Sequence, residues 1–344
     1  MVNTEEIFLS QAIAKAWESQ TLALPNPSVG ALILSSDFKI LALEAHDEFG
    51  SAHAELRACK EAFLNLTSSS QSLRDRLDLM SPQELWDFLA LNHQNLFRDC
   101  LFFVTLEPCN HSGKTPSCAK LLSILKPKKV IFGARDLTNK AQGGAEFLRS
   151  CGIEVEAEVC LQESLNLLYP FLKFEEKGRF NLFKLAMRLN GGYQNGQISN
   201  HTSRIFTHTQ RSNADSLIIS GKTIRTDSPR LDMRYSRRVG KTPKIQVLSK
   251  TLTQLDCICA KEIEVFQDPL KLCLNQGFNV IEGGYPLLME LSSKIDCLLL
   301  IIAPFFEGRN VGEIERMDFE LLFSQVFLDE DRDVALWLKP KNHA

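Results

Sequence analysis

Apolar residues recur along the first half of the chain with two alternating periods. Helical spacing predicts helices over 7–17, 53–64, 118–125 and 145–151. Short, nearly continuous apolar runs predict strands over 30–34, 100–106, 128–134 and 153–159. Strands that alternate with helices are typical of an α/β protein with a layered sheet.

Residues 65–98 interrupt this alternation. A polar run over 67–76 is followed by a capped helix, because Ser81 precedes Pro82 and Glu84 stands three positions after the serine. We interpret 65–98 as a surface insertion. A helix that binds a partner is the alternative.

A second alternation begins near residue 180. Strand-like runs and one helix, 285–294, follow one another, with the residues between 222 and 234 as a polar loop. The predicted strands cover 180–189, 214–221, 244–249, 278–284 and 295–304. The boundary falls between 145 and 178, and we divide the chain into domains 1–150 and 151–344.

Length and composition fit a protein of two domains. The chain has 344 residues, and a single hydrophobic core usually stops growing at roughly 250–300 residues. A net charge of −3 gives no general attraction for nucleic acid or for a membrane surface. The longest nearly apolar run, 297–306, is much shorter than the ~20 residues of a spanning helix, and the first residues do not resemble a secretory signal. We therefore expect a cytoplasmic protein without nucleic-acid or membrane partners.

Four residues form a pattern suited to metal chemistry. Of the ten cysteines, most are expected to be buried free thiols in a reducing compartment, but Cys109 and Cys118 flank one loop after a predicted strand. Together with His53 they supply three ligands of the kind that zinc prefers, leaving the fourth position for water. Glu55, two residues after the histidine, is placed to carry a proton between water activated by zinc and a leaving amine.

The spacing differs from the general signature of zinc-dependent base deaminases. That signature is H-x-E followed by P-C-x-x-C, and His53, Glu55 and Pro108–Cys109 match it. The second cysteine, however, follows the first by nine positions instead of three. Two free cysteines and a helical histidine without a metal are the alternative.

This longer loop resembles that of the bifunctional riboflavin-biosynthesis deaminase–reductase family. The matching stretches are PCNHSGKTPSC (108–118), PNPSVG (25–30), HDEFGSAHAE (46–55) and the segment 134–155. The resemblance implies a cytidine-deaminase-like three-layer α/β/α domain in which His53, Cys109 and Cys118 bind Zn²⁺ and Glu55 is catalytic. It also implies that the pyrimidine and its phosphate-bearing tail are held by Asn26, His46, His111 and Lys114.

The second half resembles the reductase part of the same family, which is similar to dihydrofolate reductase in fold and uses NADPH. The matching stretches are 221–234, VIEGG (280–284) and 295–308. The resemblance implies substrate contacts from Lys184, Arg211, Asp227, Leu231 and Arg234, and cofactor contacts from Thr223, Glu282, Gly283 and Gly284.

The residue types alone do not decide between two interpretations of this second site. Arginine forks such as those of Arg225, Arg230 and Arg234 recognise phosphate, but a solvated charged loop has the same composition. No G-x-G-x-x-G motif is present, which disfavours a Rossmann dinucleotide site. Gln197 stands where the family has tryptophan, and Asn190 where it has aspartate, so we expect a working but altered reductase.

These features predict a two-step enzyme that acts on a small molecule. The first step is hydrolytic deamination of a phosphoribosylated diaminopyrimidinone, and the second is NADPH-dependent reduction of its ribosyl group to ribityl. The alternatives are a deaminase whose C-terminal domain serves only interaction or assembly, and a deaminase of another base, such as a tRNA base or free cytosine. The resemblance further implies a homo-oligomer, either a dimer or a tetramer.

Overall fold

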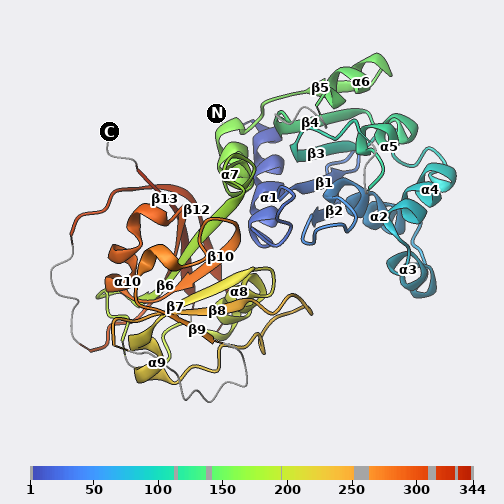
Figure 1. Cartoon of the computed structure of the whole chain (residues 1–344). Coiled ribbons are helices and arrows are strands. Elements are labelled where there is room, and N and C mark those ends of the chain that lie inside the picture. Colours follow the sequence, from blue (N-terminus) through green and yellow to red (C-terminus); the bar gives the residue numbers. More distant parts are fainter. Residues whose placement is uncertain are drawn as a thin grey trace. The chain divides into compact units, whose positions relative to one another are not determined.

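The computed structural model divides the chain into two compact units, Met1–Tyr169 and Pro170–Ala344 (Figure 1). It describes residues 3–111, 115–136, 142–194, 196–251, 263–308, 315–329 and 332–341. The division lies inside helix α7 (Leu161–Lys177), whereas the sequence-based division was placed at residue 150. Both units contain a sheet covered by helices, which confirms the predicted α/β class.

The first unit is built on a five-stranded mixed sheet in the order β2-β1-β3-β4-β5. Strand β1 runs antiparallel to both β2 and β3, whereas β3, β4 and β5 are parallel to one another. The strands are β1 (Gly30–Leu34), β2 (Ile40–Ala45), β3 (Leu101–Leu106), β4 (Lys129–Ala134) and β5 (Glu154–Glu156). The parallel part brings the loops that follow β3 and β4 to the same edge of the sheet.

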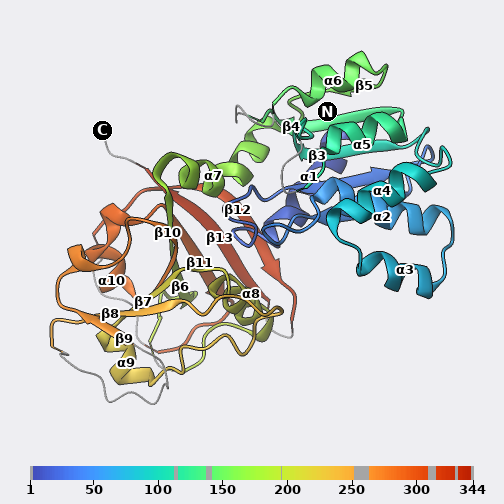
Figure 2. The ribbon, with the colours of Figure 1, turned by 45° about the vertical axis from the view of Figure 1, so that its right-hand side comes forward.

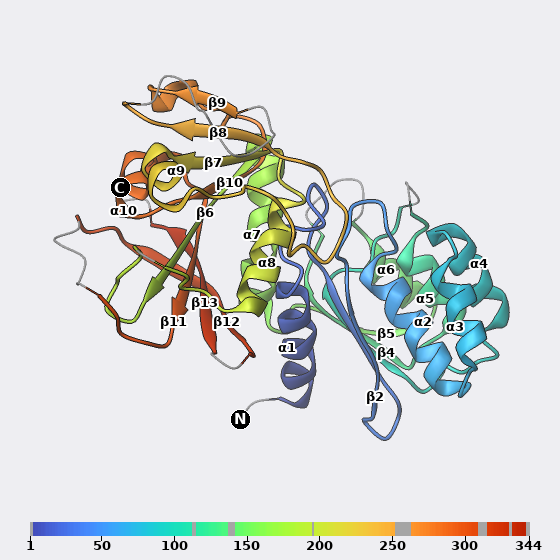
Figure 3. The same ribbon diagram turned by 90° about the horizontal axis from the view of Figure 1, so that it is seen from below.

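Helices lie on both faces of this sheet and make three layers (Figure 3). Helix α1 packs on one face, so closely that a Cβ on Gly30 would lie 2.0 Å from the Ala12 carbonyl oxygen. Helices α2, α4 and α5 lie on the other face. The helices are α1 (Thr4–Trp17), α2 (Ala54–Leu66), α3 (Gln71–Asp78), α4 (Pro82–Asn92), α5 (Cys118–Leu125) and α6 (Gly144–Ser150).

The second unit is built on an eight-stranded sheet in the order β12-β13-β11-β6-β10-β7-β8-β9 (Figure 2). The six strands from β11 to β9 in this order are parallel, and β13 runs antiparallel to both β11 and β12. The strands are β6 (Arg179–Arg188), β7 (Ser216–Ser220), β8 (Lys244–Leu248), β9 (Ile263–Phe266), β10 (Gly277–Glu282), β11 (Cys297–Ala303), β12 (Phe319–Phe327) and β13 (Asp333–Pro340).

Two helices cover opposite faces of the second sheet. Helix α10 (Tyr285–Glu290) contributes Leu287 and Leu288 to a core cluster that also contacts Leu338 of β13. The preceding residue of β13, Trp337, packs instead against Phe206 of α8 (His201–Arg211), with ring centroids 6.2 Å apart. Because neighbouring side chains of a strand point to opposite faces, α8 and α10 lie on different sides, as Figure 3 shows.

Several elements differ from the sequence-based expectation. The predicted polar loop 222–234 begins as a helix, α9 (Gly221–Asp227), which Ser220 caps by accepting a hydrogen bond from the Thr223 amide. Helices α3, α7 and α8 and strands β2, β9, β12 and β13 had not been predicted. In the described part of the chain, no helix is long and apolar enough to cross a membrane.

Candidate functional site

Three predicted metal ligands come together at the ends of three elements of the first unit. His53 is the residue immediately before α2, Cys109 follows β3 in the loop, and Cys118 is the first residue of α5. The Nδ1 atom of His53 lies 3.7 Å from Sγ of Cys109 and 3.5 Å from Sγ of Cys118. Ligand atoms around a tetrahedral zinc are separated by about 3.5–3.8 Å, given its bond lengths. The separations therefore fit zinc, and both cysteines are buried.

Thr115 fixes the orientation of the histidine ring. Its hydroxyl lies 2.8 Å from Nε2 of His53, so the other ring nitrogen, Nδ1, faces the two sulfur atoms. A hydrogen bond to the second nitrogen is the usual way to orient a metal-binding histidine. Thr115 lies in the loop between the two cysteines and had not been predicted as a residue of the site.

The charge on the two thiols is shared unequally. A hydrogen bond from the Cys118 thiol lowers the pKa of Cys109, and neighbouring His53 lowers it further although burial opposes the shift. The pKa of Cys118 is raised because it donates to Cys109 and because it is buried. Burial disfavours the charged form of His53, but its hydrogen bond with Cys109 and the charge of Glu55 raise its pKa. Cys109 is therefore the more easily deprotonated of the two thiols.

Glu55 lies in the first turn of α2 with only 5% of its surface exposed. Burial raises the pKa of its carboxyl group, and the neighbouring His53 only partly offsets that shift. The carboxyl group lies within hydrogen-bonding range of the Cys118 side chain, which places it beside the ligand set. A carboxyl group with a raised pKa next to a metal site is suited to proton transfer near neutral pH.

His46 lies next to His53, and Asn26 lies next to His46. The ring centroids of His46 and His53 are 5.3 Å apart, and burial, followed by the neighbouring charge of His53, lowers the pKa of His46 to about 4. Nδ1 of the neutral ring donates to the Ala52 carbonyl, 3.2 Å away, because a carbonyl oxygen can only accept. Nε2 is then an acceptor for the Asn26 amide, at 3.4 Å. One predicted pyrimidine contact, His46, therefore lies beside the ligand His53, and a second, Asn26, is bonded to it.

The positions of the other two predicted pyrimidine contacts, His111 and Lys114, do not indicate what they bind. His111 is exposed on the loop between the cysteines, whereas Lys114 lies outside the described residues. A role for either residue stays a prediction.

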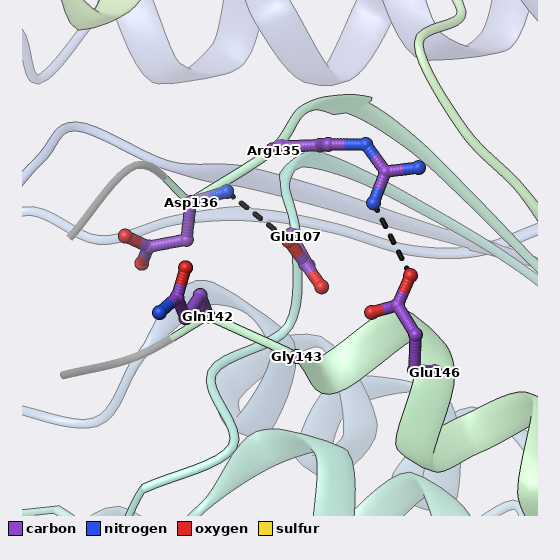
Figure 4. A pocket seen from close by; sticks show the side chains of 6 residues that line it. All are labelled: Glu107, Arg135, Asp136, Gln142, Gly143 and Glu146. Carbon is purple, nitrogen blue, oxygen red and sulfur yellow. Dashed lines mark hydrogen bonds and ion pairs between the residues drawn. The ribbon is translucent and has the colours of Figure 1, made fainter. Parts of the chain in front are cut away.

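A pocket of about 310 Å³ opens beside the same loop (Figure 4). Glu107, which follows β3, forms its floor and accepts hydrogen bonds from the amides of Asp136 and Ala145 at 3.2 and 2.9 Å. Arg135 and Glu146 face each other across it at 3.3 Å. The pocket is lined by Glu107, Arg135, Asp136, Gln142, Gly143 and Glu146.

The second unit contains a buried cluster of charged residues. Arg211 of α8 and Glu282 at the end of β10 form a two-pronged ion pair in which both N–O distances are 2.5 Å. Burial raises the pKa of Glu282, but Arg211 and Lys184 outweigh burial and lower it to about 2. Burial lowers the pKa of Lys184 itself. His208, 3.4 Å from Arg211, has a pKa lowered to about 4 by burial and then by the charge of Arg211.

Only some of the predicted reductase residues join this cluster. Arg211 donates to the Asp232 carbonyl at 3.3 Å, and Arg234 bonds the Asp232 carboxylate at 3.1 Å, so Asp232 links the two arginines. Leu231 is buried next to Asp232, with a backbone φ of 49°. Asp227 is exposed at the end of α9.

The remaining members of the predicted reductase site have local partners. The Thr223 hydroxyl bonds Ser220 at 2.9 Å, and Arg225 points to Thr251 at 3.1 Å. A Cβ on Gly284 would lie 1.9 Å from the ring of Tyr193, and one on Gly283 would lie 2.7 Å from Leu287. In this structure the two glycines are thus required by close packing, and their contact with a cofactor stays a prediction.

Both halves of the chain are similar to known proteins. Residues 2–134 match the model of the cytidine and deoxycytidylate deaminase zinc-binding region. The riboflavin biosynthesis protein RibD of Bacillus amyloliquefaciens is 28% identical over 72% of this chain, and the match spans 60% of that protein. The RibD of Synechocystis is 30% identical over 66% of this chain and is matched over 55% of its length, so this chain spans less than two thirds of these relatives. The RibD of Aquifex aeolicus is 26% identical over 89% of both chains.

Solved structures extend the likeness to the whole fold. A diaminohydroxyphosphoribosylaminopyrimidine deaminase/5-amino-6-(5-phosphoribosylamino)uracil reductase from Thermotoga maritima has a TM-score of 0.61 at 21% identity, with 98% of this chain and 99% of that chain covered. One crystal form of Acinetobacter baumannii RibD has a TM-score of 0.62 at 22% identity, with the same coverage. The chain is therefore similar to the RibD riboflavin biosynthesis proteins, and its residues 2–134 match the zinc-binding region of the cytidine and deoxycytidylate deaminases.

Proposed function

We propose that the chain is a bifunctional enzyme of riboflavin biosynthesis. Its first domain deaminates a phosphoribosylated diaminopyrimidinone, and its second reduces the ribosyl group of the product to ribityl with NADPH. The observation that carries the proposal is the His53, Cys109 and Cys118 ligand set with the buried carboxyl group of Glu55 beside it. The name of the Thermotoga protein supports the choice of substrate.

In the first domain, different residues have different roles in deamination. When bound, zinc lowers the pKa of a water molecule and makes it a nucleophile at neutral pH. Glu55 accepts a proton from the attacking water and delivers one to the exocyclic amine, which leaves as ammonia. Asn26 and His46 hold the pyrimidine edge, since one of them offers an amide and the other a neutral imidazole next to the ligand set.

The residues of the second domain suit a phosphorylated sugar. Arg234 lies at the surface, where its guanidinium group can meet an anion, and Asp232 joins it to Arg211, which is buried and paired with Glu282. Lys184 lies among these groups and supplies a further cation near Glu282. We propose that the substrate occupies this side, that Asp227 and Leu231 contact it, and that NADPH contacts Thr223, Glu282, Gly283 and Gly284.

The test is a coupled assay on the diaminopyrimidinone phosphoribosyl substrate that follows ammonia release and NADPH consumption separately. We expect both signals in the unmodified protein. Ammonia without NADPH consumption would instead support the deaminase whose second domain has no reductase activity. The absence of both signals would refute the proposed function.

Glu55→Gln provides the decisive variant in this assay. Because a positioned acid–base group contributes about 10²–10⁴-fold, we expect ammonia release to fall by that factor while the zinc content is unchanged. Glu18→Gln, an exposed acid-to-amide change in the same domain, is the control and should behave like the unmodified protein. Substantial ammonia release by Glu55→Gln would exclude the proton-transfer role.

We also propose that the protein is a cytoplasmic homo-oligomer, either a dimer or a tetramer, as the family resemblance implies. Sedimentation velocity on the full chain would measure its mass, and a monomer at micromolar concentration would contradict the proposal.

A further inference from the structure

One side chain connects segment 65–98 to the loop that contains the cysteine ligands. Trp86, on α4, donates its indole N–H to the carbonyl oxygen of Ser117, with a separation of 3.1 Å. Ser117 directly precedes the ligand Cys118 and is the capping residue of α5. The indole is half-buried in this position.

Ser117 connects the two cysteine ligands. Its hydroxyl donates to the Cys109 carbonyl at 2.8 Å and accepts from the Lys120 amide at 3.2 Å, which caps α5. The Cys118 amide in turn donates to Sγ of Cys109 at 3.4 Å. A displacement of Ser117 would therefore change the position of both sulfur atoms, because its side chain holds one cysteine and its backbone leads into the other.

The same segment also holds the helix that begins at the third ligand. Phe88 of α4 meets Phe63 of α2 edge-on, with ring centroids 5.6 Å apart. Arg74 of α3 pairs with Glu61 of α2 at 2.6 Å, and Lys60 of α2 also pairs with Asp78. Helix α2 starts directly after His53 and carries Glu55.

Burial shows that α4 is part of the core. Leu85 and Leu89 are 4% and 0% exposed, whereas a helix that waits for a partner would present such residues to solvent. Two exposed leucines, Leu79 and Leu91, do lie on the segment, but nothing covers them in this structure.

We propose that Trp86 is a positioning residue of the zinc site, and that its hydrogen bond to Ser117 holds the start of α5 so that the two cysteine sulfur atoms keep their separation from His53. The proposal rests on the zinc site of the proposed deaminase. It gives a role to a segment that the sequence had marked only as an interruption.

The test compares the zinc affinity of Trp86→Phe with that of the unmodified full chain, measured by competition with a chromophoric chelator. Phenylalanine keeps an aromatic ring but removes the N–H donor. We expect affinity to fall about three- to tenfold, because one hydrogen bond to the ligand loop is lost and a single such bond changes an equilibrium constant by about that factor. The visible spectrum of the Co²⁺-substituted protein should also change, since it reports the geometry of the cysteine ligands.

Arg74→Ala is the matched control. It removes a contact between the same segment and α2, but Arg74 makes no contact with Ser117, so zinc affinity and the Co²⁺ spectrum should stay as in the unmodified protein. If Trp86→Phe does not fold, Trp86→Met, which also lacks the donor and fills irregular space, replaces it.

The outcomes separate this proposal from the proposed function. Zinc binding by the unmodified chain with unchanged affinity and spectrum in Trp86→Phe would overturn the positioning role alone. An equal loss in Arg74→Ala would also overturn it, because the effect would then come from general destabilisation of the segment. An unmodified chain that takes up no zinc would refute the site and the positioning role together.

Discussion

Glu282→Gln should destabilise the second domain by a predictable and pH-dependent amount. The Glu282 side chain is 14% exposed and forms both oxygen contacts with Arg211, and the buried Lys184 lies near it. Glutamine has nearly the same shape but no charge. The change therefore leaves two buried cations without their shared counter-ion, and removing one partner of a buried pair typically costs about 3–5 kcal/mol.

The pKa of Glu282 gives an independent estimate. Its folded pKa of about 2 lies below the usual 4.5, because Arg211 and Lys184 outweigh burial. At about 1.4 kcal/mol per pKa unit, the charged form stabilises the folded domain by about 3 kcal/mol at neutral pH. Since the folded pKa is the lower one, this stabilisation is complete above the unfolded pKa and is lost as the pH falls towards the folded pKa. At pH 3 about 1.4 kcal/mol should remain.

Urea unfolding at a series of pH values measures this effect. Trp337 lies in β13 of the second domain, and the two other tryptophans, Trp17 and Trp86, belong to the first. With both replaced by phenylalanine, fluorescence reports the unfolding of the second domain alone. The two domains need not unfold together, so such a specific signal is required.

Glu320→Gln is the matched control for this experiment. Glu320 pairs with Lys339 at 2.9 Å in the same domain, but its side chain is 42% exposed, so the change should cost less than about 1 kcal/mol. The gap in unfolding free energy between Glu282→Gln and the unmodified domain should halve between pH 7 and pH 3. A gap below about 1 kcal/mol at pH 7, or one that does not change with pH, would refute the reasoning.

Two further predictions concern the loop of the metal ligands. Thr115→Val removes the hydroxyl that orients His53, so zinc affinity measured by chelator competition should fall about 10–100-fold, and equal affinity would show that the ring needs no such partner. Gly144→Ala places a Cβ 1.9 Å from the Pro108 carbonyl oxygen, next to the ligand Cys109. Thermal unfolding should show a loss of about 1–3 kcal/mol with reduced zinc content, and an unchanged protein would mean that α6 can move away at no cost.

The sequence alone predicted the elements whose patterns are local. The apolar run of β3, the eight residues of α5 and the capping box of α4 each lie in a short stretch, so periodicity and capping residues were sufficient to find them. Helix α8 was missed because its buried residues include Thr207, His208, Thr209 and Gln210, so the pattern of polar and apolar residues does not show which face is inside. Strand β12 was missed for a related reason, since Leu321 and Val326 are exposed on it.

The candidate zinc site could also be found from the sequence, because ligand types and an unusual loop identify His53, Glu55, Cys109 and Cys118. What holds these residues could not be found, since the matching stretch 108–118 does not show that Thr115 and Ser117 hold the ligands, and Trp86 is more than twenty positions from either cysteine. In the same way, the sequence predicted Arg211 and Glu282 as contacts for two different ligands, but only the folded chain pairs them with each other. Residue chemistry is local and can be read along the chain, whereas the partner of each group depends on which distant segments the sheet and helices bring together.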